Sequence, residues 1–78
     1  MTWTFHIVAV EGQRLFSRIL QVIEGQRTHV RMFAAEINDK SVSIIATITS
    51  EEDRAYRIEA LLYRLEDVRN VSVSQKDH

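Results

Sequence analysis

VAVEGQRLFSRILQVIEG, the stretch from Val8 to Gly25, joins an apolar strand to an amphipathic helix. The strand begins at Trp3 and ends at Val10, and its aromatic and β-branched residues alternate between two faces. Apolar residues then recur at helical spacing from Gln13 to Glu24, and Gly25 predicts a left-handed cap at the end of this helix. The short loop between strand and helix, EGQR, is where we look first for function.

The segment that follows the helix predicts a hairpin. Thr28 to Ile37 forms a second strand whose apolar residues fall on both faces. This pattern indicates either that both faces are covered or that a bulge shifts the register. The residues Asn38-Asp39-Lys40 are typical of a turn. Strict alternation from Ser41 to Thr49 then predicts a third strand paired with the second.

A second helix and a fourth strand complete the pattern. Ser50 and Asp53 predict an N-cap pair, and an apolar stripe runs behind them from Ala55 to Leu65. Val68 to Gln75 alternates again and predicts the fourth strand, which leaves residues 76 to 78 as a frayed tail. The chain therefore contains two strand-helix-strand halves within one domain, residues 1 to 78.

Right-handed crossovers favour one arrangement of these halves. It is the α+β, ferredoxin-like βαββαβ fold, a four-stranded antiparallel sheet in the order 4-1-3-2 with two helices on one face. The opposite face of the sheet stays open and is expected to expose some of His6, Val8, Val10 and Ile45. Because that is much apolar surface for a small domain, it suggests self-association or docking on a larger partner.

Composition narrows the function. The chain has 78 residues, no cysteine, 10 basic residues and 11 acidic residues, so disulfides are excluded and a nucleic-acid partner is disfavoured. Neither an apolar run of membrane-spanning length nor a basic signal-peptide region occurs, so we expect a soluble cytoplasmic protein without a membrane partner.

The residue types needed for catalysis or for a cofactor are mostly missing. His6, His29 and His78 are far apart in the predicted fold and do not form a metal set. Two glycines cannot supply a dinucleotide-binding fingerprint, and no serine lies in a nucleophile elbow. We therefore predict that the chain is not an enzyme and binds neither a metal nor a cofactor.

Several short motifs carry a resemblance to a known family. Ser17-Arg18 lies within the apolar first helix, and the second helix ends in LYRLEDV, residues 62 to 68, before the strand residues Val71-Ser72-Val73. From about Phe5 to Gln75 the chain resembles the ACT domain. Within that family it is most similar to the small regulatory subunit of acetohydroxyacid synthase (acetolactate synthase), whose second helix typically finishes in a similar Leu-x-Lys-Leu-x-Asp-Val run.

The resemblance implies a regulatory subunit. ACT domains typically pair through sheet edges or helices and bind a small amino acid at the interface, so it implies a homodimer and a branched-chain amino acid such as valine as effector. It also implies a protein partner, the thiamine-diphosphate-dependent catalytic large subunit, which this chain would bind and activate. Thiamine diphosphate, Mg²⁺ and flavin belong to that large subunit. Since the second domain of longer small subunits is missing, we expect the short type.

The loop departs from the family pattern. The effector loop of the family usually reads Asn-x-Pro-Gly, and alignment on Ser17-Arg18 puts Glu11 at the Asn position, Gln13 at the Pro position and Arg14 at the Gly position. Glu11 would repel a ligand carboxylate and the Arg14 side chain would crowd it, so we expect weak effector binding. Alternatively, Arg14 pairs directly with the carboxylate.

These considerations define the predicted site. Its effector-binding residues are Glu11, Gly12, Gln13, Arg14 and Leu15, and the partner-strand side of the interface is Arg31, Met32 and Phe33. For Arg31 and Phe33, the plainer interpretation is edge-strand solvation and dimer packing. Two alternative functions stay open: a stand-alone ACT homodimer that senses an amino acid, and an interaction module without a ligand.

Overall fold

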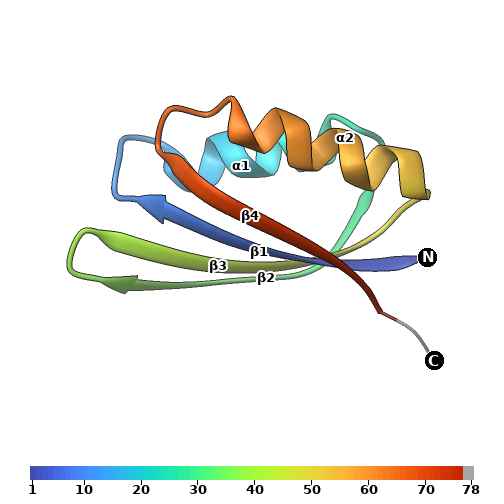
Figure 1. Cartoon of the computed structure of the whole chain (residues 1–78), viewed down its shortest axis with the longest axis horizontal. Coiled ribbons are helices and arrows are strands. Elements are labelled where there is room, and N and C mark those ends of the chain that lie inside the picture. Colours follow the sequence, from blue (N-terminus) through green and yellow to red (C-terminus); the bar gives the residue numbers. More distant parts are fainter. Residues whose placement is uncertain (77–78) are drawn as a thin grey trace.

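The computed structural model describes residues 1 to 76, and its element order confirms the predicted βαββαβ pattern (Figure 1). The elements are β1 (Thr2–Val10), α1 (Leu15–Glu24), β2 (His29–Asn38), β3 (Ser41–Thr49), α2 (Glu52–Tyr63) and β4 (Val68–Lys76). The fourth strand therefore includes Lys76, which we had placed in a frayed tail. Asp77 and His78, the rest of that tail, lie outside the described residues.

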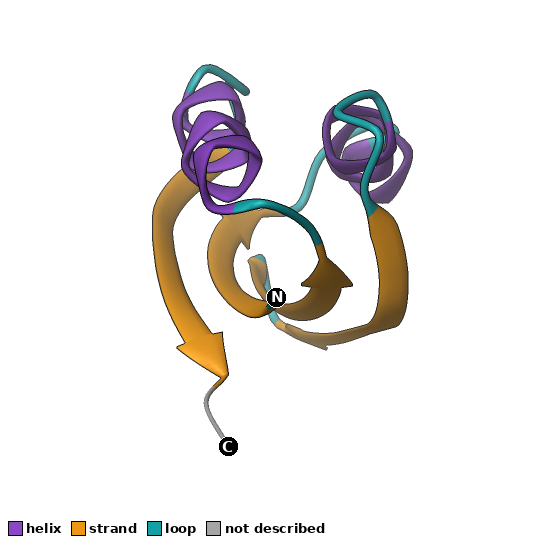
Figure 2. Ribbon diagram, turned by 90° about the vertical axis from the view of Figure 1, so that its right-hand side faces the viewer, coloured by secondary structure: helices purple, strands orange, loops and turns teal. Residues whose placement is uncertain are grey.

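The sheet has the predicted order. Its strands follow one another as β2-β3-β1-β4, which is 4-1-3-2 when it is counted from the other edge. β1 pairs antiparallel with both β3 and β4, so it is an inner strand, and β2 and β4 form the two edges. Both helices cover the same face of this curved sheet (Figure 2).

The core lies between the helices and the inner strands. On β1, alternation turns Trp3, Phe5 and Ile7 toward the helices, and each is at most 2% exposed. Each such side chain contributes about 1.5 to 3 kcal/mol by leaving water. The buried partners on the other elements are Leu15, Ile19, Ile23, Val42, Ile44, Ala46, Ile48, Ala55, Ile58, Leu62, Val68 and Val71.

α1 begins and ends differently from the prediction. It begins at Leu15 rather than Gln13, because Arg14 adopts a left-handed conformation with φ 58° and ψ 28°. The predicted left-handed cap at Gly25 is wrong, since Gly25 has φ −67°. The turn continues for two more residues, and the left-handed conformation falls on Arg27, with φ 58°.

The predicted N-cap of α2 is also wrong. The N-cap residue is Glu51, without a side-chain cap bond, and the Ser50 hydroxyl donates instead to the Glu51 carbonyl at 2.9 Å. The backbone of Ser50 is held beside β1: its N–H donates to the Met1 carbonyl at 2.9 Å, and its carbonyl accepts from Trp3 Nε1 at 3.2 Å. Because these bonds keep Ser50 against the sheet, the helix begins after it.

β2 resolves the ambiguity of the second strand in favour of a bulge. Its pairing with β3 shifts between Val30 and Met32, which leaves Arg31 as the extra residue. All its side chains are exposed except those of Val30 and Phe33, which are half-buried. Neither face of this edge strand is therefore fully covered within one chain.

The predicted open face is present as well. His6, Val8 and Ile45 are exposed there, and Val10 is half-buried. Among residues 1 to 76, no helix is long and apolar enough to cross a membrane.

Candidate functional site

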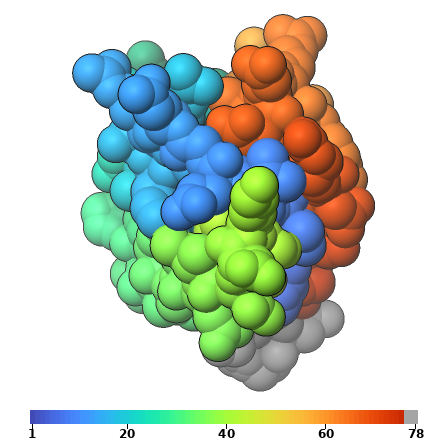
Figure 3. Space-filling model, turned by 90° about the vertical axis from the view of Figure 1, so that its left-hand side faces the viewer, coloured from blue at the N-terminus to red at the C-terminus, as the bar shows by residue number. Residues whose placement is uncertain are grey.

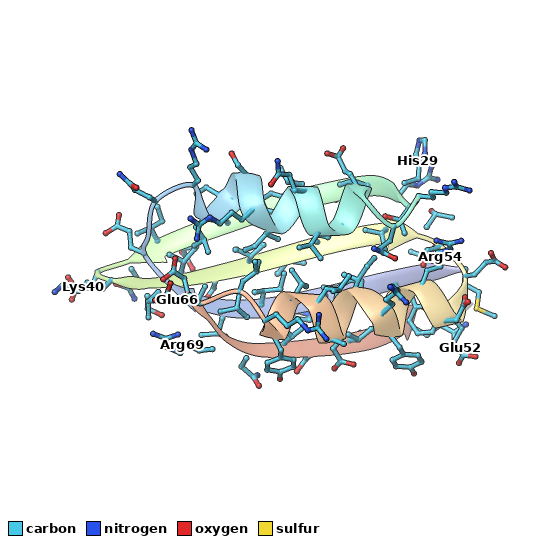
Figure 4. All side chains as sticks on the ribbon, turned by 90° about the horizontal axis from the view of Figure 1, so that it is seen from above. His29, Lys40, Glu52, Arg54, Glu66 and Arg69 are labelled. Carbon is cyan, nitrogen blue, oxygen red and sulfur yellow. The ribbon has the colours of Figure 1, made fainter. Side chains whose placement is uncertain are left out.

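Three loops meet at one end of the molecule: residues 11 to 14, the β2–β3 turn and the segment between α2 and β4 (Figure 3). Two backbone hydrogen bonds tie them together. The Glu11 N–H donates to the Lys40 carbonyl at 2.8 Å, and the Val10 N–H donates to the Asp67 carbonyl at 2.9 Å. Figure 4 shows Lys40, Glu66 and Arg69 at this end, whereas His29, Glu52 and Arg54 lie at the other.

A pocket of about 210 Å³ opens beside the first of these loops. Apolar side chains of α1, β2 and β3 line one part of it, and Glu11, Arg14 and Ser17 supply polar groups. It is smaller than the usual 300 to 1,000 Å³ of drug-sized pockets, so it suits a small molecule. Its full lining is Glu11, Gly12, Arg14, Leu15, Phe16, Ser17, Ile37 and Val42.

The structure brings four of the five predicted effector-binding residues to this pocket. Glu11, Gly12, Arg14 and Leu15 line it, whereas Gln13 is exposed and does not. Sequence reasoning missed Phe16 and Ser17 of α1, Ile37 of β2 and Val42 of β3. Ile37 and Val42 face each other across the hairpin, and the predicted turn between them was the signal that could have placed them together.

The predicted partner-strand residues lie on β2, outside the pocket of their own chain. Arg31 is exposed at the bulge, and Met32 is 43% exposed. Phe33 instead packs edge to face on Phe16, with ring centroids 6.2 Å apart and an interplanar angle of 86°. Since Phe16 lines the pocket, this contact connects the edge strand to the pocket wall.

Arg14 adopts the left-handed backbone conformation, which glycine adopts most easily. A left-handed conformation costs a residue with a Cβ roughly 1 to 2 kcal/mol. Directly after it, α1 begins, and the first N–H groups of a helix have no partner within the helix and can bind an anion. The exposed Arg14 guanidinium stands at the same place and adds a formal positive charge.

Gly12 lies against a neighbour that we did not predict, the side chain of Asp67. A Cβ built at Gly12 would lie 2.8 Å from Cγ of Asp67 and overlap its carboxylate. Asp67 is half-buried and also accepts the hydrogen bond from Val10 through its backbone. The aspartate of the LYRLEDV motif therefore packs against the loop of residues 11 to 14 through its side chain and bonds the end of β1 through its backbone.

A larger hollow lies at the opposite end of the sheet. It has about 670 Å³ and is lined by Arg27 and Arg54 together with Glu51, Glu52 and Asp53. Its lining carries charges of both signs and includes only one apolar residue, Met1, whereas the smaller pocket has four, so the smaller pocket better matches a ligand site. No group of three His, Cys, Asp or Glu side chains in the described part of the chain could hold a metal ion.

No family profile and no curated protein sequence matches the chain. Solved structures do match its fold. The ACT domain from the GTP pyrophosphokinase of Chlorobium tepidum superimposes with a TM-score of 0.84 at 17% identity, over 95% of this chain and 97% of that one. An ACT domain protein from Streptococcus pneumoniae gives a TM-score of 0.75 at 14% identity, over 95% and 88%.

A third similar structure is a much longer enzyme. A homoserine dehydrogenase from Thiobacillus denitrificans matches 92% of this chain with only 16% of its own length, at a TM-score of 0.80 and 14% identity. At sequence identities this low, the structural similarity shows that the fold is shared and shows nothing further. The chain has the fold of ACT domains.

Proposed function

We propose that this chain is a non-catalytic regulatory domain that senses a small amino acid in the pocket beside residues 11 to 17. The observation that carries the proposal is the composition of the pocket at the start of α1. Arg14 is suited to a carboxylate, Glu11 is suited to an ammonium group, and Leu15, Ile37 and Val42 offer an apolar surface to an aliphatic side chain.

The same residues explain why binding should be weak. Glu11 lies in the same small pocket as Arg14 and opposes the carboxylate that Arg14 attracts. On the β2 side, Ile37 is 54% exposed, so the wall contributed by the edge strand is unfinished in one chain. A second copy placed against β2 would cover that wall.

Dimerisation through β2 would complete the wall of the pocket that one chain leaves open. β2 is a ten-residue edge strand with exposed apolar side chains, and an uncovered edge of this kind readily pairs with another strand. Symmetric pairing would carry Arg31, Met32 and Phe33 of one protomer toward the loop end of its partner. We therefore propose a homodimer in which the two pockets lie close to the shared strands.

The finer proposal is that the dimer binds and activates the catalytic large subunit of acetolactate synthase in branched-chain amino acid biosynthesis. It is supported by the resemblance of the α1 and α2 motifs to the small subunits of that enzyme. The test is the acetolactate-forming rate of the cognate catalytic subunit with and without this chain. We expect a several-fold rise on addition. An unchanged rate, with separate elution of the two proteins, would reject this assignment and leave the stand-alone sensor.

Calorimetric titration with valine, leucine and isoleucine tests the pocket itself. We expect weak binding that is lost in Arg14→Ala. Arg27→Ala is a matched control, because Arg27 is also an exposed arginine with φ 58° but lies at the other end of the sheet. Equal loss in both variants would show that the effect of removing an arginine is not specific to the pocket, and would reject Arg14 as the partner of the carboxylate. Micromolar affinity would refute the weak-binding proposal.

A further inference from the structure

The sheet has two edges, and they differ. β2 and β4 are the outermost strands, so each has a row of backbone N–H and C=O groups that point away from the sheet. Such groups can pair with a strand of another molecule. A protein that exposes both edges can add copies on both sides without limit, whereas one open edge closes the assembly at two copies.

On β4, a tyrosine hydroxyl occupies the edge. Tyr63 is the last residue of α2, and its Oη accepts a hydrogen bond from the Val71 N–H at 3.0 Å. The hydroxyl proton can be donated to the Val71 carbonyl or to Oδ1 of Asn70, each 3.1 Å away. The N–H and C=O of one strand residue point the same way in an antiparallel sheet. Val71 therefore directs its N–H and its C=O away from β1. The Tyr63 hydroxyl can form a hydrogen bond with each of these two groups.

We infer that the Tyr63 hydroxyl closes β4 to strand addition and so restricts self-association to β2. Val71 is the fourth of nine residues in β4, so the block falls near the middle of the strand. A second copy that added along β4 would have to displace the hydroxyl from both backbone groups. The occupant that β4 excludes is therefore another copy of this chain.

The inference uses the proposed function only in naming β2 as the dimer edge. It needs no ligand and no pocket residue, so the two can fail separately. The Tyr63 side chain is 47% exposed and belongs neither to the core nor to the pocket lining. Closing the β4 edge would therefore be its structural role.

The decisive variant is Tyr63→Phe, which removes the hydroxyl and keeps the ring. Its control is Tyr56→Phe on the same helix, because Tyr56 is 50% exposed and packs edge to face on Trp3 with centroids 5.6 Å apart. Light scattering after size exclusion should give one dimeric mass for the wild type and the control. Tyr63→Phe should give larger masses that rise with protein concentration. A dimeric mass for Tyr63→Phe at every concentration overturns the inference.

Two double variants identify the edge that Tyr63→Phe exposes. Ser72 is exposed and lies opposite His6 on the open face, so Tyr63→Phe with Ser72→Lys places like charges across a β4–β4 contact and should restore the dimeric mass. Ala34 is exposed on β2, and Tyr63→Phe with Ala34→Lys should stop at two copies, now joined through β4. Growth that persists in both variants contradicts the proposed edge.

Hydrogen exchange in the wild type tests the block without any variant. The Val71 amide should exchange more slowly than the outward-pointing amides elsewhere on β4, because its N–H is bonded to Tyr63. Exchange of Val71 at the rate of a free edge amide would overturn the inference.

Discussion

Gly12→Ala should destabilise the protein through a single neighbour, Asp67. An alanine Cβ would lie 2.8 Å from Cγ of Asp67, well inside the optimum of about 3.5 to 4.0 Å for two carbon atoms. Overpacking costs about 1 to 3 kcal/mol, and the lower end applies here because the overlap falls on the carboxylate end of the Asp67 side chain, which can turn aside. Gly12 does not adopt a positive φ, so the alanine adds no backbone strain and recovers about 0.4 to 1 kcal/mol from the unfolded chain. The net loss is therefore expected to be small, up to about 1 kcal/mol.

A double-mutant cycle isolates the overlap. Asp67→Ala removes the atoms that the new methyl group meets, so Gly12→Ala in that background should be neutral or slightly stabilising. Urea unfolding can be followed by the fluorescence of Trp3, the single tryptophan, which is 2% exposed. With a slope near 1 kcal/mol per molar urea, a net loss of this size shifts the midpoint by up to about 1 M. An equal loss in both backgrounds would refute the packing of Asp67 against Gly12.

Three further predictions concern α1 and its contacts. Arg14→Gly should keep or raise the unfolding free energy, by up to about 1 kcal/mol, because glycine adopts φ 58° without strain; a clear loss in urea unfolding would mean that the arginine side chain stabilises the loop. Ile19→Ala should lower the unfolding free energy by about 2 to 5 kcal/mol, since Ile19 is fully buried. In a double-mutant cycle, Phe16 and Phe33 should show a coupling of about 0.5 to 1.5 kcal/mol; zero coupling would reject their edge-to-face contact.

The fold was predictable because its periodicities are clear. Alternation from Trp3 to Val10 and from Ser41 to Thr49 predicted the buried faces of both inner strands, and helical spacing predicted the buried face of α1. The helix boundaries were not predictable at the same level. Local preference predicted an N-cap at Ser50, but the backbone of Ser50 is hydrogen-bonded to Met1 instead. It also predicted a left-handed residue at Gly25, but the α1 turn continues past Gly25.

The candidate site was half predictable. Residues of the loop itself could be named, because the loop interrupts two regular elements and the family resemblance points to it. The contributions of Ile37 and Asp67 depend on how the hairpin and the α2–β4 segment fold back beside the loop. Such contacts between distant segments leave no local pattern. The same holds for Tyr63, whose partner Val71 lies on another element.

The most direct test of the account is an amide chemical-shift titration of the wild-type chain with valine, leucine and isoleucine, which detects weak binding at each residue. We expect shifts in residues 11 to 17 and at Ile37 and Val42, and none in the groove around Arg27 and Arg54. Shifts confined to that groove, or no shift for any of the three amino acids, would contradict the claim that the pocket beside the β1–α1 loop is an amino-acid site.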